Sequence, residues 1–256
     1  MADASGIASV VVQDEEPQNN RDDSGGYAKA NAALRGLYEE RMARDEARHQ
    51  RTPDEVNIGA VAPLRLYSLP GRHLGAQIWH SGGLLARHLA LGGCPGIAGR
   101  RCLELGAGLG VVGLAAAAFG NAHSVVLTDL EELQPMLRRN IELNGLSGTC
   151  RAETLNWGTL PPESWGVFDA VLAADVVYPT KDTAMLFALR DTILSVCRKD
   201  ADVLLVLAYH ERTAEDRDFL HGELLPHFDM DVKDIGDNEG LGCQVYIGRC
   251  RPQPLV

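Results

Sequence analysis

The stretch that decides the fold is Leu103-Glu104-Leu105-Gly106-Ala107-Gly108-Leu109-Gly110, an apolar segment that runs into a glycine-rich loop. Glycines directly after a buried strand let the backbone turn sharply and pass close to a ligand. The helix that follows such a loop presents unpaired N–H groups. This arrangement is typical of strand-to-helix loops that bind nucleotide-like cofactors in α/β proteins. We therefore expect a cofactor site here.

The spacing of the glycines alone does not identify the cofactor, because Gly108 to Gly113 also matches the G-x-G-x-x-G pattern of dinucleotide-binding proteins. Glu104 adds information, since a carboxylate at the end of this strand would repel a pyrophosphate but attract sulfonium and ammonium groups. Asp129 ends the next expected strand, nineteen residues after Gly110, where an acidic side chain accepts hydrogen bonds from the ribose of either cofactor. Together the two carboxylates favour S-adenosylmethionine over a nicotinamide dinucleotide.

Short apolar runs alternate with amphipathic helical patterns from residue 101 onward. We expect strands at 102–105, 125–128, 150–155, 168–173 and 203–209, and helices at 111–119, 133–143, 183–198 and 214–225. Two further alternating segments, 229–233 and 244–249, predict a terminal antiparallel pair. The expected fold is therefore α/β: a Rossmann-like, doubly wound sheet of seven strands with an antiparallel last strand.

The chain before the sheet is expected to form two parts, at 1–26 and 27–100. The first is acidic and too polar to bury a core, so we expect a disordered tail. The second is expected to pack on the seven-strand domain of residues 101–256. Its pattern predicts an amphipathic helix at 27–49 and a hairpin whose strands, 61–69 and 74–79, are joined by a Pro-Gly turn. It also predicts a second helix at 81–91, capped by Ser81.

The composition disfavours several classes of function. The chain has 24 Lys and Arg against 35 Asp and Glu, and its net charge of −11 opposes binding to a phosphate backbone, so no nucleic-acid partner is expected. Six cysteines without a C-x-x-C pair and scattered histidines predict free thiols in a reducing compartment and no metal site. No apolar stretch approaches the roughly 20 residues of a membrane span. We expect a cytoplasmic protein, with the nucleus as an alternative, and no membrane partner.

Several short stretches outside the glycine loop repeat the pattern of one family: Trp79, Asn140-Ile141-Glu142-Leu143-Asn144, Leu155-Asn156-Trp157-Gly158 and Asp175-Val176-Val177-Tyr178. With them, the chain from about Leu64 to Gly248 resembles the small seven-strand protein-lysine methyltransferases that include chaperone- and translation-factor-modifying enzymes. The resemblance implies that S-adenosylmethionine is the cofactor. It also implies a cofactor site lined by Trp79, Gly106, Ala107, Gly108, Asp129, Leu130, Trp157 and Ala174. His80 departs from the family pattern, which often has a small or acidic residue or Pro there, and it bears on the pocket entrance.

The same resemblance implies that Asp175 and Tyr178 form a D-x-x-Y motif beside the acceptor amine. Methyl transfer from a sulfonium is an in-line displacement, so the enzyme chiefly positions a neutral amine against the methyl carbon. A carboxylate can orient the lysine ammonium before its proton leaves, and a tyrosine hydroxyl can hold a remaining N–H group. We therefore expect an S-adenosylmethionine-dependent N-methyltransferase that acts, as a monomer, on lysine side chains of a protein substrate.

Three alternatives stay open on the sequence alone. The acceptor could be a small-molecule amine or another side chain, because the cofactor half would be the same. A catalytically silent cofactor-binding scaffold is the second, and intact Asp175 and Tyr178 argue against it. A nicotinamide-dependent oxidoreductase is the third, and Glu104 and the lack of a second dinucleotide-binding half argue against it.

Overall fold

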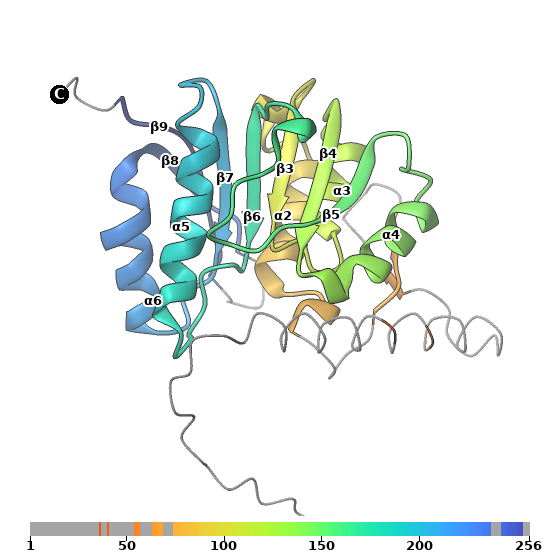
Figure 1. The fold of residues 1–256 in the computed structure, drawn as a ribbon, viewed down its shortest axis with the longest axis horizontal. Helices are drawn as coiled ribbons and strands as arrows, with labels where there is room; N and C mark the ends of the chain where they lie inside the picture. The colour runs from red at the N-terminus through yellow and green to blue at the C-terminus, as the bar shows by residue number, and fades with distance from the viewer. Residues whose placement is uncertain are drawn as a thin grey trace, which may run out of the picture.

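Figure 1 shows the fold in a computed structural model of the chain. The described residues are Gly36, Glu40, 54–56, 63–68, 74–236 and 242–252. The tail expected at 1–26 lies outside them, and so does the helix expected at 27–49 apart from Gly36 and Glu40, which are helical. In the part of the chain that the structure describes, no helix is both long and apolar enough to cross a membrane.

A seven-stranded sheet forms the centre of the domain. Its strands are β3 (Arg101–Leu105), β4 (Ser124–Asp129), β5 (Cys150–Thr154), β6 (Ala170–Ala174), β7 (Leu204–Tyr209), β8 (Phe228–Asp234) and β9 (Gln244–Cys250). Their order is β5-β4-β3-β6-β7-β9-β8. The first five are parallel, whereas β9 runs antiparallel to β7 and β8. The predicted fold is confirmed, with strand bounds that agree within two residues.

Helices cover both faces of the sheet (Figure 1). They are α2 (His80–Ala90), α3 (Val111–Ala118) and α4 (Gln134–Leu143) on one face, and α5 (Thr183–Cys197) and α6 (Ala214–Phe219) on the other. After α6 the chain continues through a π-helical turn at Leu220–Leu224 and a 3-10 turn at Leu225–His227 before it enters β8. The four helices expected after residue 101 are therefore present, although α6 is shorter than expected.

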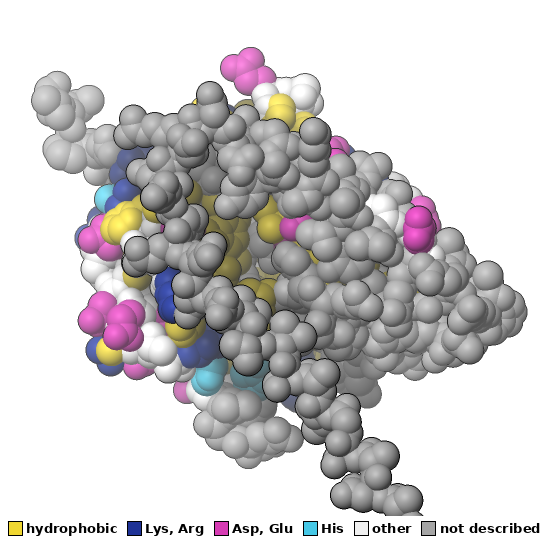
Figure 2. All heavy atoms as spheres, turned by 60° about the horizontal axis from the view of Figure 1, so that its bottom comes forward, with side chains coloured by type: hydrophobic (Ala, Val, Ile, Leu, Met, Phe, Trp, Pro, Cys, Tyr) yellow, Lys and Arg dark blue, Asp and Glu magenta, His cyan; other side chains and the backbone are white. Residues whose placement is uncertain are grey.

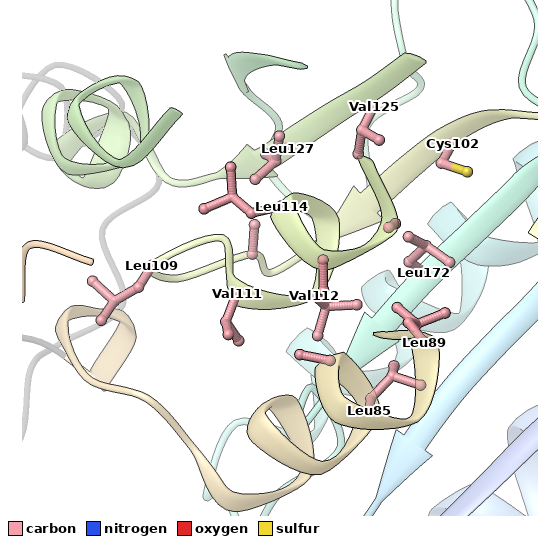
Figure 3. Packing of buried hydrophobic residues seen from close by; sticks show 14 of the residues in the cluster. Leu85, Leu89, Cys102, Leu109, Val111, Val112, Leu114, Val125, Leu127 and Leu172 are labelled. Carbon is pink, nitrogen blue, oxygen red and sulfur yellow. The ribbon is translucent and has the colours of Figure 1, made fainter. Parts of the chain in front are cut away.

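Each central strand contributes to two hydrophobic cores because successive side chains of a strand point to opposite faces. In β3, Cys102 faces the α3 side while Leu103 faces the α5 side. Figure 3 shows the first core, where Leu85 and Leu89 of α2 lie against Val112 of α3. All six cysteines are buried and free, as their apolar surroundings predict.

The predicted hairpin before the sheet has a different partner strand. β2 (Leu64–Leu66) pairs antiparallel with β1 (Asp54–Val56), which precedes it in the chain. The prediction that residues 74–79 form the second strand is wrong, because Leu74–Ala76 forms a 3-10 turn. The Pro70-Gly71 turn lies outside the described residues. Leu66 is fully buried, so the apolar alternation around it reports packing on the domain rather than a local turn.

The side chain of Asn140 joins the segment after β2 to the glycine loop. It lies in α4 and is fully buried. Its Oδ1 accepts a hydrogen bond from Tyr67 N at 2.6 Å, and its Nδ2 donates to Tyr67 O at 3.2 Å and to Leu109 O at 3.0 Å. The side-chain amide of Asn140 therefore provides hydrogen-bond partners for backbone groups at Tyr67 and Leu109, which lie outside regular secondary structure.

Replacing Asn140 with alanine should lower the free energy of unfolding by about 2–3 kcal/mol, because buried backbone groups lose their partners. Asn144→Ala is the matched control. Asn144 makes the same pair of bonds to the backbone of Arg65, at 3.0 and 2.8 Å, but at the surface, where water can replace them. Its Nδ2 also donates to the backbone oxygen of Asn140 at 2.7 Å, a bond that Asn140→Ala leaves in place. We expect its cost to stay below about 1 kcal/mol in urea denaturation. Equal losses in the two variants would contradict this role of Asn140.

Candidate cofactor and acceptor site

A cavity of about 870 Å³ opens at the carboxyl edge of the parallel strands. All eleven residues selected from the sequence line it: Trp79, Glu104, Gly106, Ala107, Gly108, Asp129, Leu130, Trp157, Ala174, Asp175 and Tyr178. Figure 2 looks onto this edge of the molecule and shows hydrophobic side chains gathered near the middle of the visible face. Segments far apart in the sequence thus meet at one concave site, as ligand sites in such sheets do.

The glycine loop adopts a shape that other residues would not fit. Gly106 and Gly108 have φ angles of +63° and +54°. A Cβ atom on Gly106 would lie 2.9 Å from Val176 Cγ1 and 3.1 Å from Trp157 Cζ2, and one on Gly108 would lie 3.0 Å from Gly75 O. Glycine is therefore required at both positions for its backbone freedom and for its lack of a side chain.

Asp129 fixes the loop from the end of the neighbouring strand. Its Oδ2 accepts a hydrogen bond from Gly108 N at 2.7 Å, and its Oδ1 accepts one from Leu130 N at 2.8 Å. Two backbone donors therefore hold the carboxylate in one orientation at the wall of the cavity. A fixed acceptor at this position suits ribose hydroxyls, which donate to such carboxylates in related folds.

Glu104 is a buried acid beneath the loop, with 3 % of its surface exposed. Its Oε2 accepts a hydrogen bond from Gly113 N at 2.9 Å. Burial raises the pKa of Glu104 to about 8, and the nearby charge of Asp129 acts in the same direction, although the bond from Gly113 opposes it. An ionised carboxylate is therefore costly here unless a cation lies beside it.

Two tryptophans form aromatic walls of the cavity. Trp79 directly precedes α2, and its Nε1 donates to Leu74 O at 2.7 Å, which fixes the indole ring. Trp157 follows β5 and packs against the glycine loop at Gly106. Ala174, at the end of β6, presents only a methyl group to the cavity. An aromatic ring in the cavity wall offers a flat surface against which a planar base can stack.

Tyr178 lies on the loop after β6. Its Oη is 3.6 Å from Met185 Sδ. Burial raises the pKa of Tyr178, and the charges of Asp129 and Asp182 add to this. The phenol is therefore protonated at neutral pH and keeps both a donor and an acceptor function.

Asp175 is held by three donors from two other segments. Its side chain is 3 % exposed, and its backbone has a φ of +56°. Ser81 N donates to Oδ2 at 2.8 Å, Ser81 Oγ donates to Oδ1 at 3.0 Å, and Arg212 Nη2 donates to Oδ1 at 2.5 Å. The prediction that Ser81 caps α2 is therefore wrong. The helix begins after Trp79, and the carboxylate of Asp175 accepts the N–H of its first turn.

Arg212 also lines the cavity, although it is not among the eleven residues selected as site residues from the sequence. It pairs with Asp175, and its Cζ lies 5.7 Å from the ring of Trp79. Its place in the sequence indicates a site residue, because Arg212 lies in the loop after β7 as Asp175 lies in the loop after β6. His210 in the same loop is turned elsewhere: its Nδ1 lies 2.5 Å from Gly242 O, and it does not line the cavity.

Comparison with solved structures finds the same α/β fold in another protein. The N-methyltransferase NodS from Bradyrhizobium japonicum, solved with S-adenosyl-L-homocysteine, superimposes with a TM-score of 0.51 at 16% identity. The match covers 67% of this chain and 86% of NodS. The likeness at this identity concerns the fold.

The sequence comparisons identify the family. A family model described as lysine methyltransferase matches residues 62–223, and the chain belongs to this family of enzymes. Protein N-lysine methyltransferase METTL21A of Mus musculus is 34% identical over 155 residues, which cover 58% of this chain and 67% of the relative. Protein-lysine N-methyltransferase EFM6 of Saccharomyces cerevisiae is 27% identical over 179 residues, covering 61% and 71%. EEF1A lysine methyltransferase 3 of Mus musculus is 30% identical over 158 residues, covering 60% and 63%.

Gly106→Ala should destabilise the protein more than Gly145→Ala does. Gly145 has nearly the same φ, +66°, but an added Cβ would meet nothing within 4 Å. Both variants bear the left-handed strain of roughly 1–2 kcal/mol, and only Gly106→Ala adds crowding of about 1–3 kcal/mol. Urea denaturation measures both losses, and similar values would show that the loop has room for a side chain.

Glu104→Gln should stabilise the protein without ligand, increasingly so as pH rises. The unfolded acid ionises near its ordinary pKa of 4.5 and the folded acid near 8. The wild type therefore has its full stability below the unfolded pKa and loses it as pH rises toward the folded pKa. The neutral amide has no such dependence. Unfolding free energies measured at about pH 5, 7 and 9 should diverge with pH, and a constant difference would rule out the raised pKa.

Proposed function

We propose that the chain transfers the methyl group of S-adenosylmethionine to the side-chain amine of a lysine in a protein substrate. The observation that carries the proposal is the meeting of Glu104, Asp129, Asp175 and Tyr178 at one cavity. The first two suit the cofactor and the last two suit the acceptor. Membership of the lysine methyltransferase family supports this reaction, and so do relatives named as protein-lysine methyltransferases.

The cavity fits this cofactor in charge and in shape. A volume of about 870 Å³ accommodates a molecule of this size. Glu104 gains a compensating cation from the sulfonium and ammonium groups, and Asp129 accepts from the ribose. Trp157 offers a flat surface beside the adenine. When bound, S-adenosylmethionine supplies an electrophilic methyl carbon, and the remaining tasks fall to the protein.

Those tasks are to position and desolvate the acceptor amine. A carboxylate has about four acceptor positions, and Ser81 and Arg212 use three of those on Asp175. The remaining position accepts an N–H of the lysine ammonium and orients it before the proton is lost. The hydroxyl of Tyr178 accepts another N–H of the amine. Once the ammonium had lost its proton to solvent, Asp175 and Tyr178 would hold the neutral amine toward the methyl carbon that bound S-adenosylmethionine would supply. Apolar neighbours such as Met185 and Val176 exclude water from the line of attack.

The net charge of the chain and its free cysteines bear on the substrate class and on the cellular compartment. A net charge of −11 disfavours nucleic acid as a substrate, and buried free cysteines suit a reducing compartment. We infer that the protein works as a monomer in the cytoplasm, with the nucleus as an alternative, and that its partner is the protein that it methylates.

Calorimetric titration tests the cofactor. We expect S-adenosylhomocysteine to bind and NAD not to bind. Because the ammonium of the ligand favours the ionised form of Glu104, binding near pH 7 should release a proton, measurable as a heat that depends on the ionisation enthalpy of the buffer. Glu104→Gln should bind more weakly and release no proton. Tight binding of NAD without binding of S-adenosylhomocysteine would overturn the proposal.

Transfer of label tests the acceptor. A lysate incubated with the enzyme and methyl-labelled S-adenosylmethionine should yield label on lysine side chains of a protein, located by mass spectrometry. A parallel incubation with Tyr178→Phe, which keeps the ring and removes the hydroxyl, should yield much less. Label that appears only in small metabolites would exclude a protein substrate while leaving the cofactor assignment intact.

A further inference from the structure

The charged groups around the cavity are unequally distributed in sign. Three of them are carboxylates, on Glu104, Asp129 and Asp175. Among the described residues that line the cavity, Arg212 is the only lysine or arginine. Asp129 and Asp175 therefore repel an anionic part of a ligand, as Glu104 does once it is ionised, whereas Arg212 attracts it.

The guanidinium of Arg212 has hydrogen-bonding capacity left over. Nη2 donates to Asp175 Oδ1, and Nη1 lies 3.5 Å from the carbonyl oxygen of His210. A guanidinium has five N–H donors. Within 74–236 and the other described segments, the structure gives the remaining donors no acceptor. The side chain is 22 % exposed, so most of its surface is withdrawn from solvent.

The position of Arg212 is fixed from both ends. Its backbone N–H donates to Oδ2 of Asp216 at 3.3 Å, and Asp216 is 1 % exposed and forms the capping box of α6 with Thr213. At the other end, the ion pair with Asp175 holds the guanidinium beside Trp79 and the first turn of α2. A pre-positioned guanidinium loses little conformational freedom when it binds a second anion.

We propose that Arg212 binds the α-carboxylate at the amino-acid end of the cofactor. This inference rests on the proposed function, because S-adenosylmethionine carries a carboxylate and an ammonium on the same carbon. Glu104 attracts the ammonium and Arg212 attracts the carboxylate. The two side chains, which carry opposite charges, thus each bind one charged group of the zwitterion. The ion pair with Asp175 places the guanidinium of Arg212 beside the acceptor motif. The guanidinium thereby fixes where the amino-acid end of the cofactor lies relative to the acceptor.

The test compares two ligands that differ only in the carboxylate: S-adenosylhomocysteine and its decarboxylated analogue. For Arg212→Gln, we expect the affinity for S-adenosylhomocysteine to fall about 10- to 100-fold, as for loss of a charge-assisted hydrogen bond. The affinity for the decarboxylated analogue should change less than about 3-fold. Arg212→Lys should retain part of the discrimination, because it keeps the charge. Arg217→Gln is the matched control, since Arg217 is an exposed neighbour that pairs with Glu211 and Asp218, and both affinities should be unchanged.

The variant Asp175→Asn distinguishes direct binding of the carboxylate by Arg212 from an indirect effect of Arg212 through Asp175. If Arg212 only holds Asp175 in place, Arg212→Gln weakens both ligands equally and Asp175→Asn reproduces that loss. This result would overturn the inference and leave the cofactor assignment standing. A wild type that binds neither ligand would overturn the cofactor assignment, and the inference with it. Melting temperatures of the variants show whether each is folded before its affinity is interpreted.

Discussion

The hydrogen bond from Gly108 N to Asp129 Oδ2 is the contact on which the site depends. It fastens the loop after β3 to the end of β4, and the bond from Ala107 N to Thr128 O, at 2.9 Å, reinforces it. With the loop held there, Gly106 is pressed against Trp157, and the first turn of α3 reaches Glu104 through Gly113 N. The cavity wall is therefore a consequence of how two adjacent parallel strands end.

The sheet was predictable from the sequence because its signals are local. Apolar runs, helical periodicity and turn residues each lie within about ten residues of chain, and from residue 101 onward they gave every strand within two residues. The hairpin before the sheet was not predictable in the same way. Its strand β2 pairs backward with β1, and apolar alternation does not specify a partner. Ser81 was misassigned for a related reason, since its partner is 94 residues away.

The site was predictable as a set of residues but not as a network. All eleven selected side chains reach one cavity because strand ends of a parallel sheet share an edge. The sequence gives no sign that Asp175 is paired with Arg212, 37 residues later, because an ion pair across two loops leaves no periodic pattern. Asp175 therefore links three elements: the end of β6, the start of α2 and the loop after β7. The loop that carries Asp175 and Tyr178 is therefore tied to the cavity wall at α2 and at Arg212.

The insertion of β9 between β7 and β8 has a consequence for synthesis of the chain. The strands around the glycine loop, β3 to β5, leave the ribosome early and pair with near neighbours in sequence. The apolar edge of β7 has no partner until residues 244–250 have emerged, because β9 is the strand that covers it. An uncovered edge strand is a template for aggregation. Until β9 pairs, the nascent chain therefore exposes the edge of β7 to pairing with a wrong strand.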